Sequence, residues 1–250
     1  LVKSMFSDKE FSNQINMSGV NSINWARIIA QSVYYFYCYF LAEDENQPIN
    51  FSVPTGNFGD VYAGYLAKKL GLPINKLIVA TNQNDILHRA ISKGKYETEH
   101  VSETISPSMD IQIASNFERL IYDLNNHDSS QTLDDMKNIK QNGKYTIDDE
   151  KLKKINQDFL SARMSEQETL DVIKNIYEKF NMVLDPHTAI GYGAFDKHDL
   201  KGNNIVLATA HPCKFPDAIL KAINLKSDLP DELKFILDEK ENYGIIENNL

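Results

Sequence analysis

Two short apolar segments on either side of a helix constrain the fold of this chain more than any other feature. Residues 49–54 and 76–81 each have the length of a strand, and the second is almost uniformly apolar rather than alternating. Uniform apolarity is typical of a strand that is covered on both faces of a sheet. The residues between them predict a helix to about Leu70, which Gly71-Leu72-Pro73 ends. Strand, helix and strand in this order predict a right-handed βαβ unit with parallel strands.

The rest of the chain is expected to add helices and one more strand. A helix over 25–41 is apolar around most of its circumference, which predicts that it is buried. A third buried strand is expected over 205–208. Further helices are predicted over 116–124, over 149–162, over 166–180 with a capping box at its start, and from Pro186 onward; residues 125–150 are expected to form polar surface.

Composition narrows the class of protein. The 250 residues carry a formal net charge of −9, which argues against a nucleic-acid partner. The most apolar stretch, residues 28–41, is too short and too polar to span a membrane, and the start of the chain has no signal-peptide pattern. Cys38 and Cys213 are expected to be free thiols in a reducing cytoplasm, and the scattered histidines predict no metal site.

The segment Ser52-Val-Pro-Thr-Gly-Asn-Phe-Gly59 carries the clearest chemical signal. A buried strand passes through Gly56 and Gly59 directly into a helix, so free N–H groups and the positive helix end converge, as a phosphate requires. The segment matches neither a Walker loop nor the GxGxxG fingerprint. Spacing alone leaves open the alternative of a tight turn without a ligand.

Two further segments could bind a ligand. Asn21, Ser22 and Arg27 surround a helix start and could hold a second oxyanion, although a simple cap with a surface arginine explains them as well. Thr209 follows the third strand at its carboxyl end, where ligands bind in open α/β sheets, and its hydroxyl could bond a heteroaromatic nitrogen. A satisfied turn is the alternative there. His187 and His211 are interpreted as structural hydrogen-bonding residues.

Six segments in the same order as in a known family give the chain a resemblance to threonine synthases of the longer bacterial and fungal form. They extend over most of residues 18–216. The segments are Asn21-Ser-Ile-Asn-Trp-Ala-Arg27 with Gln31 and Tyr34-Tyr35; Val53-Pro-Thr-Gly-Asn-Phe-Gly59; Ala80-Thr-Asn-Gln-Asn-Asp-Ile-Leu87; Ile105-Ser-Pro-Ser-Met-Asp110 with Asn116-Phe-Glu-Arg119; Asp185-Pro-His-Thr-Ala189; and Thr209-Ala-His-Pro-Cys-Lys-Phe215.

The resemblance implies an α/β protein of pyridoxal-phosphate fold type II, like the tryptophan synthase β subunit, with a parallel sheet and flanking helices. Residues 1–17 would end the small domain, and residues 18–250 would form the large cofactor-binding domain with a helical insertion around 88–182. The implied reaction is the pyridoxal 5'-phosphate-dependent conversion of O-phospho-L-homoserine and water to L-threonine and phosphate, in the cytoplasm.

Site residues also follow from the resemblance. Gly56, Asn57, Phe58 and Gly59 would hold the cofactor phosphate, and Thr209 would bond the pyridine nitrogen. The substrate phosphate would be bound by Asn21, Ser22 and Arg27. Asp110, Asn116 and Arg119 receive no assigned role, and Arg119 is expected to be a structural ion-pair partner.

One departure from the family pattern is large. The Schiff-base lysine segment, His-Gly-Pro-Thr-x-x-Phe-Lys-Asp, and the following Thr-Ser-Gly-Asp-Thr-Gly segment are both absent, so no catalytic residue is assigned. Residue 1 is not methionine, and residues 1–6 resemble the middle of a helix. We therefore expect a C-terminal fragment that is inactive without the N-terminal part of the same protein.

Two alternatives remain at this point. The chain could belong to another enzyme of fold type II, such as a serine/threonine dehydratase. It could also be a non-catalytic threonine synthase-like protein that binds a phosphometabolite or a partner. The paired segments at 21–27 and 209–212 favour a phosphorylated substrate over the dehydratase.

Overall fold

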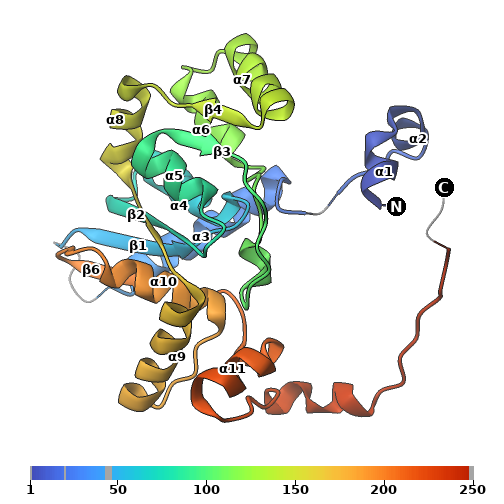
Figure 1. Ribbon diagram of the computed structural model, residues 1–250, viewed down its shortest axis with the longest axis vertical. Coiled ribbons are helices and arrows are strands. Elements are labelled where there is room, and N and C mark those ends of the chain that lie inside the picture. Colours follow the sequence, from blue (N-terminus) through green and yellow to red (C-terminus); the bar gives the residue numbers. More distant parts are fainter. Residues whose placement is uncertain (1, 20, 43–46, 248–250) are drawn as a thin grey trace.

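A four-stranded parallel sheet forms the centre of the protein in the computed structural model, which describes residues 2–19, 21–42 and 47–247. The strand order is β5-β2-β1-β6, and all three pairings are parallel (Figure 1). The strands are β1 (Ile49–Pro54), β2 (Ile74–Thr81), β5 (Phe159–Arg163) and β6 (Asn203–Val206). The predicted parallel βαβ unit is therefore confirmed, with α4 (Gly59–Lys69) connecting β1 to β2.

Helices cover both faces of this sheet. Neighbouring residues of a strand point to opposite faces, and β1 shows what each face contacts. The ring of Phe51 lies 4.8 Å from that of Tyr35 in α3 (Trp25–Phe40), whereas the Ser52 hydroxyl donates to the Gly191 carbonyl in α10 (Pro186–Asp196) at 2.6 Å. All six residues of β1 are buried, as a doubly covered strand requires.

The remaining elements surround this core. A small antiparallel pair, β3 (Lys95–Glu97) with β4 (Lys144–Thr146), lies beside the main sheet, and α1 and α2 stand apart from it at the N-terminal end (Figure 1). In the described part of the chain no helix is long and apolar enough to cross a membrane. The other helices are α1 (Val2–Ser7), α2 (Lys9–Gln14), α5 (Ile86–Lys93), α6 (Phe117–Leu124), α7 (Ser129–Asn142), α8 (Asp149–Asp158), α9 (Glu166–Phe180) and α11 (Pro216–Ile223), with 3-10 turns at Pro107–Met109, Pro212–Lys214 and Asp231–Asp238.

The helix predicted over 149–162 is wrong from residue 159 onward. Helix α8 ends at Asp158, and Phe159–Arg163 forms β5, which pairs with β2 from Leu77 to Thr81. Phe159 is fully buried there, so pairing and burial at the edge of the sheet override the helical pattern of the preceding residues. The region 88–182 thus contributes a strand to the main sheet as well as helices, and its polar part 125–150 contains α7 and β4.

Helix α3 is also less buried than its sequence predicts. Only Ile28, Ser32 and Tyr35 are buried, whereas Val33 and Tyr37 on the other side are 60% and 64% exposed. The helix packs on α4 along one side and has no layer of the described chain on the other. The expectation that an all-round apolar helix is buried all round therefore fails here.

Candidate functional site

The glycine segment forms a tight connection between β1 and α4, as predicted. A Cβ atom added to Gly56 would lie 2.4 Å from the backbone oxygen of Ser108, a distance that side chains do not tolerate. The loop that contains Ser108 therefore lies directly against Gly56. Glycine is needed at this position because another backbone approaches closely.

The end of this segment leaves a helix start open for an anion. Phe58 has φ 65°, in the left-handed region, and its side chain makes no capping hydrogen bond to α4. Its ring is buried and lies 5.2 Å from that of Phe117. Phe58 can therefore offer a ligand only its backbone, and the first N–H groups of α4 are available for an anion such as phosphate.

Gly59 brings the second predicted segment next to the first. A Cβ atom at Gly59 would lie 3.2 Å from Nδ2 of Asn116 and 3.5 Å from the backbone oxygen of Ser22. The Asn116 amide donates to the carbonyls of both Ser22 (2.8 Å) and Asn57 (3.1 Å). The starts of α3 and α4, which the sequence marks as two separate anion sites, are therefore neighbours.

The predicted residues at the start of α3 differ in their surroundings. Asn21 Oδ1 accepts a hydrogen bond from the Ile23 N–H at 3.0 Å, and Asn24 caps the helix by accepting from Ala26 N–H at 2.9 Å. Ser22 is half-buried against the glycine segment, and Arg27 is exposed in the first turn. A cap by Asn21 or Ser22, as their position before the helix predicts, is therefore wrong, because Asn24 caps α3 instead.

A pocket of about 160 Å³ lies at the carboxyl ends of β1 and β6. It brings together two predicted residues from distant parts of the chain, Gly56 and Thr209. This is the edge of the sheet at which ligands of open α/β folds bind. The other residues that line it are Pro54, Ser108, Met109, His187, Ala210, Lys214 and Phe215.

A buried hydrogen-bond network supports the wall of this pocket. His187 Nε2 accepts from the Ser108 N–H at 3.3 Å, which places the ring proton on Nδ1, where it is donated to Asp185 Oδ1 at 3.0 Å. Burial raises the pKa of Asp185, but the hydrogen bonds from His187 and Thr188 lower it by more than burial raises it. The pKa of Asp185 is therefore below its ordinary value. Thr188 Oγ1 in turn accepts from the Thr209 N–H at 3.2 Å. The start of α10 is therefore connected to the Ser108 loop through His187 and to Thr209 through Thr188.

The loop over the pocket has no role that its sequence predicts, although it belongs to a segment that resembles the family. Asp110 holds this loop in place. Its Oδ1 accepts from Asn82 Nδ2 (2.7 Å) and Asn84 Nδ2 (2.9 Å), and its Oδ2 accepts from the Thr104 N–H (2.8 Å). Asn82 and Asn84 follow β2, so the clustering of polar residues after a buried strand was the available signal.

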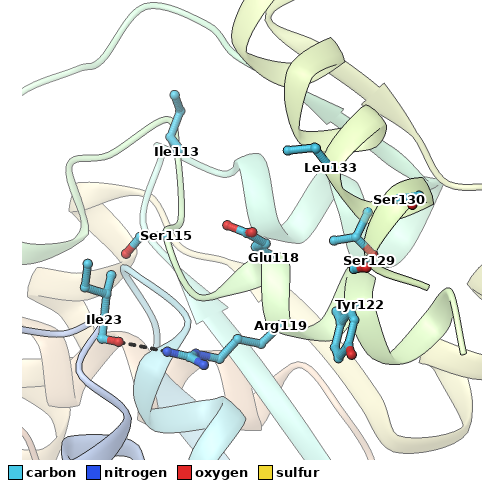
Figure 2. Close-up of a pocket in the computed structure, with 10 residues that line it drawn as sticks. Ile23, Ile113, Ser115, Glu118, Arg119, Tyr122, Ser129, Ser130 and Leu133 are labelled. Carbon is cyan, nitrogen blue, oxygen red and sulfur yellow. Dashed lines mark hydrogen bonds between the residues drawn. The ribbon is translucent and has the colours of Figure 1, made fainter. Parts of the chain in front are cut away.

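A larger cavity of about 1000 Å³ lies beside α6 and α7 (Figure 2). Arg119 extends across it and donates from Nη2 to the Ile23 carbonyl at 2.8 Å. The guanidinium also lies 5.1 Å from the Trp25 ring centroid and donates from Nε to Asn116 Oδ1. In the described residues Arg119 thus acts through hydrogen bonds and a cation–π contact, and the expected ion pair is wrong.

Comparison with known proteins identifies the relatives of the chain. The family model for the C-terminal part of threonine synthase matches residues 188–250. Threonine synthase of Saccharomyces cerevisiae is 44% identical over 275 residues, which cover 99% of this chain and 54% of the yeast protein. The chain thus spans about half the length of the curated relatives it matches.

Solved structures agree with this match. The crystal structure of threonine synthase from Brucella melitensis with bound PLP has a TM-score of 0.95 and 44% identity, over 99% of this chain and 54% of that one. A pyridoxal 5'-phosphate-dependent aspartate racemase, at 10% identity and a TM-score of 0.55, shares the fold alone. The expected fold type II is therefore confirmed.

Proposed function

Because this chain belongs to the threonine synthase family and spans about half the length of its members, we propose that it forms the phosphate-binding and ring-binding part of a pyridoxal-phosphate site. The complete enzyme would convert O-phospho-L-homoserine and water to L-threonine and phosphate. The observation that carries this proposal is the pocket in which Gly56 and Thr209 meet at the carboxyl edge of the sheet. The 44% identity to threonine synthases favours this reaction over that of a dehydratase.

The residues of the pocket fit the cofactor. The open start of α4 and the glycine at position 56 suit a phosphate group, which would accept hydrogen bonds from the backbone of Gly56, Asn57, Phe58 and Gly59. The Thr209 hydroxyl would bond the ring nitrogen, and a neutral partner leaves that nitrogen less protonated than a carboxylate would. When bound, the cofactor would supply an electron sink for reactions at the amino-acid carbon atoms.

The start of α3 would bind the phosphate of the substrate. Asn21, Ser22 and Arg27 offer amide, hydroxyl and guanidinium donors, and the guanidinium can bind two phosphate oxygens at once. The contacts of Asn116 with Ser22 and Asn57 would place this second phosphate beside the first. A substrate with its own phosphate group fits this arrangement.

The lysine that anchors the cofactor in this family is not in a matching segment of the chain. Lys214 lines the pocket, but it belongs to the segment that follows Thr209. We propose that the N-terminal part of the family's fold supplies the lysine that anchors the cofactor and acts as the base, so that this chain alone is inactive. The complete enzyme would act in the cytoplasm. Residues 18–250 would form the large domain, and residues 1–17 the end of the small one.

A cofactor titration tests this proposal. Pyridoxal phosphate is added to the purified chain, absorbance is recorded before and after borohydride, and the reduced protein is digested to locate any modified lysine. We expect saturable, weak binding without a stoichiometric reducible adduct, and no phosphate release from O-phospho-L-homoserine. Gly56→Ala should abolish the binding.

Two results would contradict the proposal. No saturable binding would refute the cofactor site and favour a non-catalytic role. A stoichiometric adduct that is lost in Lys214→Gln would show that this chain carries its own anchor.

A further inference from the structure

Asn116 connects the two helix starts of the proposed site, a role that the sequence did not reveal. It precedes α6 and is fully buried. Its backbone N–H donates to the Asn57 carbonyl at 3.0 Å, and its side-chain amide donates to that same carbonyl and to the Ser22 carbonyl. One side chain therefore holds the segment before α3 and the segment before α4 together.

Arg119, one turn further along α6, completes the connection. Its Nε donates to Asn116 Oδ1 at 3.0 Å, so the orientation of the Asn116 amide is fixed with its NH₂ group toward Ser22 and Asn57. Its Nη2 donates to the Ile23 carbonyl (Figure 2). Its guanidinium lies over Trp25, the first residue of α3. Both residues thus hold the same short segment, Ser22 to Trp25.

Gly59, the first residue of α4, lies directly against the Asn116 amide. Its φ is not in the left-handed region, so the turn itself does not require a glycine. A Cβ atom there would instead lie 3.2 Å from Asn116 Nδ2. A side chain at this position would press on the Asn116 amide, so glycine leaves the amide room beside both carbonyls.

We propose that Asn116 is a positioning residue which, locked by Arg119, sets the distance between the cofactor-phosphate site at α4 and the substrate-phosphate site at α3. This proposal rests on the proposed function for the identity of the two ligands. Asn116 touches neither ligand and acts only through the backbone segments that it holds. Its loss should weaken binding without removing any group that contacts a phosphate.

The chain contains a built-in reporter for this connection. Trp25 is the only tryptophan in the sequence, and it stacks on Arg119 at the start of α3. Quenching of its fluorescence by acrylamide measures how tightly that segment is held, without any ligand. The same variants can then be titrated with pyridoxal phosphate.

Asn116→Ala is the main variant, and Asn125→Ala is its matched control. Asn125 is a buried asparagine at the other end of α6, and its amide donates to Thr132 and Asp135, away from the site. We expect Asn116→Ala to increase quenching of Trp25 and to weaken pyridoxal-phosphate binding about tenfold, because its hydrogen bonds to the Ser22 and Asn57 carbonyls are lost. Asn125→Ala should change stability but neither of these measurements.

Arg119→Met guards against a variant that fails to fold, because it keeps the apolar stem and leaves Asn116 in place. It should increase Trp25 quenching and weaken binding in the same direction. The proposal is overturned if Asn116→Ala matches the unmodified chain in quenching, if Arg119→Met leaves pyridoxal-phosphate binding unchanged, or if the two asparagine variants weaken binding equally. Absence of cofactor binding in the unmodified chain would refute the proposed function, whereas the quenching comparison would still decide whether Asn116 holds the α3 start.

Discussion

Helices α3 and α4 both start at the proposed site, but the protein buries them to different extents. The α3 sequence is the more apolar of the two, yet it buries only Ile28, Ser32 and Tyr35. Helix α4 contains two lysines and an aspartate, and it buries six of its eleven residues. Hydrophobicity alone would therefore rank the two helices in the wrong order, because position relative to the sheet decides burial.

The contact between them depends on one small residue. A Cβ atom at Gly64 in α4 would lie 2.5 Å from the Tyr35 ring and 2.9 Å from Leu77 of β2. The Tyr35 hydroxyl donates to the Asp60 carbonyl at 2.8 Å and to its carboxylate at 3.2 Å. Tyr35 therefore attaches α3 to α4 by close packing and by hydrogen bonds to Asp60.

The largest difference in stability is expected between alanine substitutions at two tyrosines of α3. Tyr35→Ala should lower the free energy of unfolding by about 3–5 kcal/mol, since it empties a fully buried site. Tyr37→Ala, at a residue that is 64% exposed, should change it by less than about 0.5 kcal/mol. Urea unfolding of both variants measures the difference, and similar losses would show that α3 is held along both sides.

Substitution of Asp60 is expected to stabilise the folded chain, by less than Tyr35→Ala destabilises it. Burial raises the pKa of this carboxyl to about 6, although the hydrogen bond from Tyr35 lowers it in part. The folded chain then keeps a proton that the unfolded chain loses near pH 4, so stability falls as pH rises from about 4 to about 6. Asp60→Asn, which can still accept from Tyr35, should be more stable at pH 7 by about 2–3 kcal/mol. Parallel stability profiles of the two proteins between pH 4 and 7 would contradict this.

Gly64→Ala should be destabilising by about 1–3 kcal/mol, because the added methyl group has no space beside Tyr35 and Leu77. The sign is informative, since alanine normally stabilises a helix interior by about 1 kcal/mol relative to glycine. Gly244→Ala is the control, as nothing lies within 4 Å of a Cβ atom there. A gain in melting temperature for Gly64→Ala would mean that α3 can move away from α4 at little cost.

Elements that depend on neighbouring residues were predicted from the sequence, whereas pairings between distant residues were not. The strand over 49–54, the turn through Gly56 and the helix to about residue 70 agree with the structure because each depends on neighbouring residues. Strand β5 was missed, since its pairing with β2 involves residues distant in sequence. Thr209 and Gly56 were each marked by local pattern, but only the parallel order of β1 and β6 brings them into one pocket.

The sequence by itself determined the cap before Pro186 and the capping box at the start of α9, because these depend on hydrogen bonds within a few residues. It also determined the βαβ order and the glycine segment, because the strand, turn and helix each follow from a local pattern of residues. Only the tertiary structure decided which side of α3 is buried, why Gly56 must lack a side chain and that Gly59 packs closely on Asn116. It also revealed that Asn116 joins two segments 59 and 94 residues away from it in the chain. Those features arise from contacts between distant segments, and such contacts leave no periodic or local mark in one sequence.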